Sequence, residues 1–342
     1  MVLVTGATGF IGSRVVSALK HHGLKRVRCL VRSSSNVTGL ERLTAEGGHE
    51  FDIELVRGNL LSREDCDRAT KGVSVIYHLA AGTGTKSFAD AFANSVVTTR
   101  NLLEGALRHT SLRRFVSVSS FAVYTNEGKP RDEVLDEECP TEAYPALRGD
   151  SYCFAKAKQD ELIIDYGRKH SLPYVLVRPG VVYGPGKQRI HGRIGMDTFG
   201  VFVHLGGSNP IPFTFVDNCA DAIALAGLKP GVDGEVFNVV DDDLPSSRQF
   251  LELYKQEVSH FRSFYLPHFA SYLLCFFWEK YSAWSQGQLP PAFNRRVWMT
   301  AWKRTNYSNA KVKKLLGWTP RVSTAEGLKQ YFGSCKQMRA GA

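Results

Sequence analysis

A tyrosine and a lysine, Tyr152 and Lys156, stand four residues apart in the segment SYCFAKAKQDE (151–161). In a helix this spacing places both side chains on one face. A tyrosine with an ordinary pKa of about 10 is a poor base, but a neighbouring lysine cation favours the phenolate. Tyr152 could then exchange a proton with a substrate hydroxyl or carbonyl group. Most such pairs in helices are structural, so the interpretation depends on the surrounding elements.

A strand that ends in serines lies upstream of this helix. The segment RRFVSVSS (113–120) is predicted to be a buried strand, and Ser120 is its last residue. We expect the Ser120 hydroxyl to hydrogen-bond the same substrate oxygen as Tyr152.

The chain begins MVLVTGATGFIG, in which an apolar run, Met1–Thr5, is followed by three glycines and a helical pattern at Ser13–Lys20. Gly6 allows a tight turn, Gly9 lets the backbone approach a pyrophosphate, and Gly12 lets the helix pack closely on the strand. Strand, glycine turn and helix in this order predict a dinucleotide site. A bound nicotinamide would pass a hydride while Tyr152 moves the proton.

The end of the second predicted strand indicates which dinucleotide. Val31 is followed by Arg32 and three serines, where an acidic residue would bind the ribose of NAD. Arg32 can pair with a 2′-phosphate, helped by serines such as Ser33. The sequence therefore favours NADP over NAD, and the alternative is that Arg32 is only a solvated cation.

Strands alternate with helices over the first half of the chain. Strands are predicted at 27–31, 51–60, 73–81, 113–120, 174–180 and 234–240, and helices at 89–108 and 152–170. Residues 211–226 are predicted to form a strand followed by a helix, and a last helix is predicted at 308–316. This pattern predicts an α/β fold with a Rossmann-type, doubly wound parallel sheet. Residues 1–180 would form the dinucleotide-binding core, to which 211–240 return. Residues 181–210 and 241–342 would form a smaller substrate-binding lobe.

Composition sets limits on compartment and partners. The 342 residues carry a formal charge of +10, which suits an anionic cofactor or substrate or an acidic membrane surface. No basic stripe or nucleic-acid motif is present, so nucleic acid is not expected as a partner. Seven scattered cysteines have no metal-ligand spacing, so we expect no metal site and a reducing, cytoplasmic location. The first strand starts at Met1, so no signal peptide is expected.

The segments TGATGFIG, HLAA, SSFAVY, YCFAK, RPGVVYGPG and LLGWTP, in this order and spacing, resemble the extended short-chain dehydrogenase/reductases. This superfamily comprises NAD(P)-dependent sugar epimerases, dehydratases and 3β-hydroxysteroid dehydrogenases. The resemblance implies a catalytic set of Ser120, Tyr152 and Lys156, with Asn94 as a structural asparagine. It implies cofactor contacts from Gly6, Thr8, Gly9, Phe10, Ile11, Gly12, Arg32, Ser33, Asn59, Leu60, Leu79, Ala80, Ala81, Tyr152, Lys156, Pro179 and Val182. Many relatives form dimers through a four-helix bundle, so a homodimer is expected by analogy.

Two positions need comment against the family pattern. Asn59 occupies the place where the family usually has an aspartate near the adenine, and an asparagine can still donate and accept there. Ser120 lies four residues before Tyr124, which selects it over Ser119 as the catalytic hydroxyl. Ser119 is the alternative.

The substrate is indicated less directly. Nucleotide-sugar epimerases usually carry a diphosphate-binding arginine at the place of Ile211, and an apolar residue cannot neutralise a pyrophosphate. The aromatic stretch Phe264–Trp278 is predicted to be a buried helix, with a membrane- or lipid-contacting helix as the alternative. Four basic residues after GPG could instead bind a phosphate or carboxylate, or be a solvated loop: Lys187, Arg189, His191 and Arg193.

Three functions follow in order of preference. The first is an oxidoreductase that interconverts a secondary alcohol and a ketone on an apolar, sterol-like or lipid-linked substrate. The second is a nucleotide-sugar epimerase or reductase, and the third is a non-catalytic NADP(H)-sensing protein. The complete set of Ser120, Tyr152 and Lys156 argues against the third.

Overall fold

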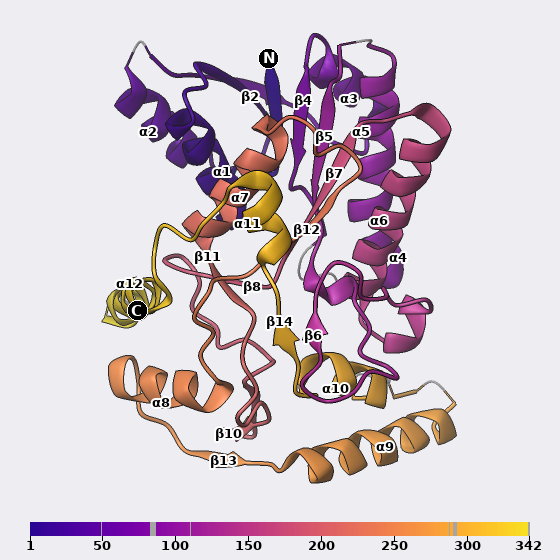
Figure 1. The fold of residues 1–342 in the computed structure, drawn as a ribbon, viewed down its shortest axis with the longest axis vertical. Coiled ribbons are helices and arrows are strands. Elements are labelled where there is room, and N and C mark those ends of the chain that lie inside the picture. The colour runs from indigo at the N-terminus through magenta and orange to yellow at the C-terminus, as the bar shows by residue number, and fades with distance from the viewer. Residues whose placement is uncertain (49, 83–86, 110, 287, 290–292, 341–342) are drawn as a thin grey trace.

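A computed structural model describes residues 1–48, 50–82, 87–109, 111–286, 288–289 and 293–340. Its central sheet has seven strands, all parallel, in the order β3-β2-β1-β4-β5-β7-β12 (Figure 1). They are β1 (Val2–Thr5), β2 (Arg26–Val31), β3 (Asp52–Arg57), β4 (Val75–His78), β5 (Arg114–Val118), β7 (Tyr174–Pro179) and β12 (Val236–Val239). The strand order reverses between β1 and β4, which is where ligands of doubly wound sheets bind. The predicted fold class is confirmed.

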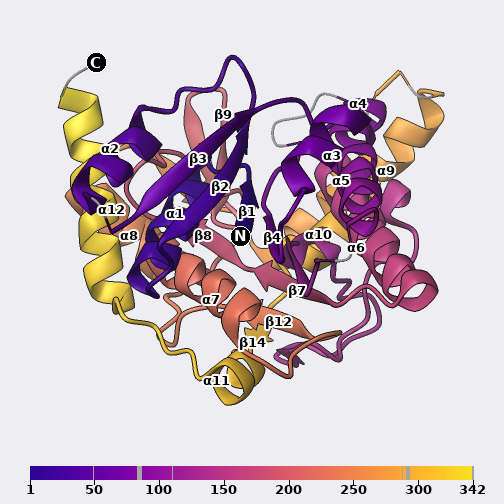
Figure 2. The same ribbon diagram turned by 90° about the horizontal axis from the view of Figure 1, so that it is seen from above.

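Helices cover both faces of this sheet, as Figure 2 shows. One face carries α1 (Phe10–His21) and α7 (Val216–Leu228), which pack on each other, with α2 (Thr38–Gly47) and α11 (Ala310–Leu316) beside them. The other face carries α3 (Arg63–Thr70), α5 (Thr98–Leu107) and α6 (Ser151–His170). The strands β1, β4 and β5 are buried along their whole length, which explains their continuous apolar runs.

The helix predicted at 89–108 is interrupted. It consists of α4 (Phe88–Phe92), a π-helical turn at Ala93–Val97 and α5. Such turns insert one extra residue into a helix and often occur at functional sites. Asn94 lies in this turn.

The remaining chain forms a lobe at the carboxyl ends of the strands, at the bottom of Figure 1. Its strands are β6 (Val134–Leu135), β8 (Val181–Tyr183), β9 (Gly195–Thr198), β10 (Val201–His204), β11 (Phe213–Phe215), β13 (Ser263–Tyr265) and β14 (Asn306–Tyr307). Its helices are α8 (Ser247–Glu257), α9 (His268–Trp284) and α10 (Arg295–Ala301), and α12 (Thr324–Ala340) lies at its side. The strands pair as β13-β10-β9, β11-β8 and β14-β6.

Two expectations for this region were wrong. The helix at 308–316 is not the last, because α12 follows it and buries Tyr331 and Phe332 in the main core. The aromatic stretch is neither one helix nor buried: Phe264 and Tyr265 belong to β13, Pro267 precedes the helix, and α9 exposes most of its large side chains. Within the described chain, no helix has the length and apolar character needed to cross a membrane.

Candidate active site

The glycine turn after β1 has the geometry of an anion site. A Cβ on Gly12 would lie 2.0 Å from the Gly6 carbonyl oxygen, and one on Gly6, whose φ is +72°, would lie 2.9 Å from the Ala80 nitrogen. Gly9 is the N-cap of α1, and among the described residues no side chain caps this helix start, which leaves its first N–H groups available to a ligand. A close backbone with free N–H groups at a helix start fits a pyrophosphate.

The residues predicted to bind the adenosine half of the cofactor lie beside this turn. Arg32 follows β2 on the surface, and within the described chain its side chain has no hydrogen bond or ion pair. Arg57, from β3, donates to the Ser33 carbonyl oxygen at 3.1 Å. Asn59 is held by its own loop, since its backbone N–H donates to Asp65 at 2.8 Å and its side-chain oxygen accepts from Leu61 at 3.0 Å.

The other predicted cofactor residues lie at the same carboxyl edge of the sheet. Leu79 donates its N–H to the Thr5 carbonyl oxygen at 3.2 Å, which holds the loop after β4 against the glycine turn. The set that the topology brings to this edge is Thr8, Leu60, Ala80, Ala81, Pro179 and Val182.

Ser120 and Tyr152 are in contact. Ser120 follows β5 and caps a short 3-10 helix, η2 (Phe121–Val123), by accepting from the Ala122 N–H. Tyr152 lies in the first turn of α6, where the Asp150 carboxylate caps the helix by accepting from the Tyr152 N–H at 2.9 Å. Burial raises the pKa of the Tyr152 hydroxyl, and its hydrogen bond with Ser120 acts in the opposite direction. Asp150 was not among the predicted site residues, although an Asp directly before a helix is an N-cap signal.

Lys156 is buried under the end of β5. Its Nζ donates to the Val118 carbonyl oxygen at 2.7 Å and to Gln159 Oε1 at 2.9 Å. Burial lowers the pKa of the Lys156 ammonium to about 8, against the opposing effect of Asp160. A chemical group with this pKa changes its charge near neutral pH, which suits a role in proton transfer.

A buried chain of hydrogen bonds continues from Lys156 toward the glycine turn. Gln159 donates to Thr99 Oγ1 at 2.7 Å, and His78 lies between Thr99 (2.9 Å) and Thr5 (2.7 Å). Burial lowers the pKa of His78 to about 3, so its ring is neutral. The chain therefore fixes the Lys156 side chain relative to β1.

Ser119 points to the interior, away from this site. Its hydroxyl donates to Asp160 Oδ2 at 2.8 Å, and Arg178 donates to the same oxygen at 3.1 Å. The Arg178 guanidinium lies 4.8 Å from the centre of the Tyr124 ring. Ser120, rather than Ser119, is therefore the serine beside Tyr152.

Asn94 is not brought to these side chains by any hydrogen bond in the described structure. Its amide donates to the Asp90 carbonyl oxygen at 2.9 Å and to the Asp90 carboxylate at 2.8 Å. Its own carbonyl oxygen accepts from Thr98. These bonds stabilise the π-helical turn.

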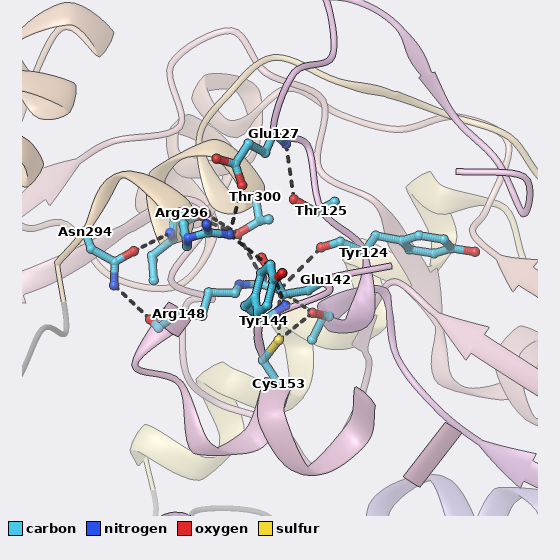
Figure 3. Close-up of polar contacts among 12 residues, drawn as sticks. Tyr124, Thr125, Glu127, Glu142, Tyr144, Arg148, Cys153, Asn294, Arg296 and Thr300 are labelled. Atoms are coloured by element: carbon cyan, nitrogen blue, oxygen red, sulfur yellow. Dashed lines mark hydrogen bonds and ion pairs between the residues drawn. The ribbon is translucent and has the colours of Figure 1, made fainter. Parts of the chain in front are cut away.

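A cluster of polar side chains around Arg148, which the sequence did not indicate, joins the segment before α6 to α10 (Figure 3). Arg148, in the short helix η3 (Pro145–Arg148), is buried and donates to Cys153 Sγ and to Thr300 Oγ1, each at 2.8 Å. Arg296, from the start of α10, pairs with Glu142 at 3.0 Å. Cys153 Sγ also donates to the Ala122 carbonyl oxygen at 2.9 Å, which fixes the start of α6 against η2. The cluster positions Tyr152 relative to Ser120.

The basic loop after β8 lies mostly on the surface. A cavity of about 560 Å³ is lined by Lys187, Arg189 and His191. Lys187 Nζ lies 5.1 Å from the centre of the Phe10 ring, beside the glycine turn. Arg193 is half-buried and donates to the Tyr307 hydroxyl at 3.2 Å.

Ile211 is fully buried in the main core. Its side chain packs in this core, and its backbone N–H donates to the Pro245 carbonyl oxygen. Within the described chain, this position offers no cation to a diphosphate.

The doubly wound sheet, the glycine turn and the Ser120–Tyr152 pair with Lys156 one turn further on define a nicotinamide-dinucleotide enzyme of the short-chain dehydrogenase/reductase class. The model of the NAD dependent epimerase/dehydratase family matches residues 2–239, and the chain belongs to this family. The predicted resemblance is thereby confirmed.

Individual relatives differ in their reactions. A trifunctional UDP-glucose 4,6-dehydratase/3,5-epimerase/reductase of Arabidopsis thaliana is 28% identical over 70% of this chain and 36% of its own length. A 3β-hydroxysteroid-dehydrogenase/decarboxylase of the same plant is 23% identical over 99% of this chain and 80% of its own length. The structure of a UDP-glucuronic acid 4-epimerase from Bacillus cereus with NAD is similar in fold, with a TM-score of 0.71, 22% identity and coverage of 98% and 99%.

Proposed function

We propose that the protein is an NADP-dependent oxidoreductase that interconverts a secondary alcohol and a ketone. The observation that carries the proposal is the placement of Ser120 beside the Tyr152 hydroxyl at the carboxyl edge of the sheet, next to a turn that fits a pyrophosphate. When bound, the nicotinamide supplies or accepts the hydride. Ser120 holds the substrate oxygen, and Tyr152 donates or accepts its proton. Lys156, as an ammonium, favours the Tyr152 phenolate.

NADP as the preferred cofactor rests on Arg32. The family name states NAD, whereas Arg32 is exposed, unpaired within the described chain and placed at the end of β2. A guanidinium pairs well with a 2′-phosphate, while the ribose hydroxyls of NAD are usually bound by a carboxylate.

An apolar, sterol-like or lipid-linked substrate is supported by two features, one in the main core and one in the smaller lobe. Ile211 is buried where a sugar-nucleotide enzyme would need an arginine, and α9 lines an apolar groove. The likeness to the 3β-hydroxysteroid-dehydrogenase/decarboxylase over nearly the whole chain agrees with this class.

A nucleotide-sugar epimerase or reductase is the second candidate. The half-buried Arg193 favours it, because Arg193 is bonded to Tyr307 and, among the described residues, has no carboxylate partner. A substrate phosphate could provide the missing negative charge.

The first experiment compares ligands by thermal stability in the presence of NADPH. UDP, GDP, dTDP and a panel of sterols are tested, since a ligand at about a hundred times its Kd adds about 2.7 kcal/mol. Stabilisation by sterols alone supports the apolar substrate, and stabilisation by a nucleotide supports the second candidate.

Turnover is then followed by NADPH absorbance with the oxidised form of each stabilising compound. Tyr152→Phe should bind NADPH like the parent and lose about a hundredfold or more of the rate. Tyr144→Phe, at an exposed tyrosine nearby, is the matched control and should change neither property. Near-native turnover by Tyr152→Phe would refute the assigned role of Tyr152.

A further inference from the structure

The helix α9 presents its large apolar side chains to solvent. One row along it comprises Phe269, Leu273, Phe277, Tyr281 and Trp284, of which Phe269, Phe277 and Trp284 are 72%, 62% and 76% exposed. Residues spaced by three and four positions share one face of a helix. The buried side of α9 instead carries small side chains, Ser271, Cys275 and Ser282. Helices on the surface of globular proteins normally turn their large apolar side chains toward the core and their polar side chains toward solvent.

A second exposed aromatic residue borders the same face. Phe199, at the turn between β9 and β10, is wholly exposed and has a φ of +51°, which is unfavourable for a phenylalanine. Its neighbour Thr198 lines, together with Leu274 and Phe277 of α9, an apolar groove of about 480 Å³. The turn and the helix are therefore adjacent. We name Phe199 and the row on α9 the aromatic face.

The charges around the aromatic face sum to a small positive charge. The carboxylate on α9, Glu279, is paired with Arg295 at 2.9 Å. The other charged side chains are Lys280 on α9, Arg262 directly before β13 and Asp197 on β9, and their charges sum to one positive charge. The whole chain carries +10. This balance favours a negatively charged partner.

The dimensions favour a lipid surface as that partner. The 17 residues of α9 span roughly 25 Å at about 1.5 Å per residue. The row ends in Tyr281 and Trp284, residue types that prefer the boundary between lipid headgroups and acyl chains. Because no described helix can cross a membrane, the face would lie in the interface plane.

We propose that the aromatic face docks this protein on an anionic lipid bilayer. Phe199 and the α9 row enter the headgroup region, and Lys280 and Arg262 remain among the lipid phosphates. The docking is independent of the proposed reaction, since it involves neither Ser120 nor Tyr152.

The test is co-sedimentation of the full chain with phosphatidylcholine vesicles, with and without phosphatidylglycerol. Binding should require phosphatidylglycerol and weaken as salt rises. Phe277→Ser and Trp284→Ser should each reduce the partition coefficient between vesicles and water by about tenfold or more, because each substitution removes apolar area that would be buried in the lipid. Phe199→Gly should do the same without harming the fold, because glycine tolerates the positive φ.

The matched control is Leu228→Ser, which removes an exposed apolar side chain from α7 on the face of the central sheet. It should bind vesicles like the parent, and NADPH affinity should be unchanged in every variant. The proposal is overturned if the parent does not bind anionic vesicles. It is equally overturned if the parent is a dimer that Trp284→Ser converts to a monomer, since the face would then be a contact between two copies.

Discussion

The folded environment of Lys156 predicts a measurable dependence of stability on pH. Burial lowers the pKa of this ammonium from 10.5 to about 8, so between these values the unfolded chain holds a proton that the folded chain has released. Stability rises with pH wherever the unfolded state binds more protons, so Lys156 destabilises the fold at low pH and this penalty is lifted as pH rises. From about pH 7 to about pH 9 the gain is roughly 1 kcal/mol.

Buried thiols act in the opposite direction over the same interval. Burial raises the pKa of Cys29, Cys66 and Cys153 from 9.0 to about 12, so these thiols ionise first in the unfolded chain and stability falls as pH rises. The total pH dependence therefore does not isolate Lys156. The difference between the parent and Lys156→Met does, because the thiol contribution is common to both.

The assay is urea unfolding of both proteins at about pH 7 and about pH 9, read as the free energy of unfolding. Relative to Lys156→Met, the parent should gain roughly 1 kcal/mol between the two pH values. Lys158→Met is the control, since Lys158 lies on the outer side of α6 and pairs with Glu161 at 2.7 Å. Equal pH dependences of the parent and Lys156→Met would refute the desolvation of Lys156.

Three further predictions concern the glycine turn, Arg32 and the pair of serines. Gly12→Ala should lose NADPH binding and melt earlier, because its Cβ would lie 2.0 Å from a carbonyl oxygen, whereas Gly39→Ala, with nothing within 4 Å, should melt like the parent in calorimetry. Arg32→Asp should weaken NADPH binding by about tenfold or more relative to NADH in fluorescence titrations, and an unchanged ratio would remove Arg32 from the 2′-phosphate site. Ser120→Ala should lose about a hundredfold in turnover and melt only slightly earlier, from the lost cap of η2. Ser119→Ala should keep its turnover and lower the melting temperature more, because it removes one of the donors to the buried Asp160 carboxylate; the reverse result would exchange the two assignments.

The sheet was predictable because parallel strands buried on both faces leave continuous apolar runs in the sequence. Each of these strands lies within a few residues of its predicted position. The glycine turn was predictable because only glycine fits where a Cβ would meet the Gly6 carbonyl oxygen. Local rules of this kind need no knowledge of distant partners.

The contact of Arg148 with Thr300 was not predictable, because it joins residues that are far apart in the sequence. Arg148 and Thr300 are 152 residues apart, and a charged residue in a single sequence indicates solvent rather than a buried partner. Gln159 could have been found, since it lies three residues after Lys156 and so shares its helix face. The exposure of α9 contradicts the rule that apolar residues are buried, and such exceptions are expected at functional surfaces.

The aromatic face and Ser120 are connected through a short series of contacts. Trp302 lines the apolar groove and donates its ring N–H to the Gly192 carbonyl oxygen at 3.0 Å. The next residue, Arg193, bonds Tyr307, whose ring stacks on Phe121 at 5.7 Å between ring centres. Phe121 directly follows Ser120. Packed side chains thus link the apolar groove to the serine that we propose binds the substrate oxygen. Membrane docking and an apolar substrate are separate proposals, and these contacts are the structural link between the two regions that they involve.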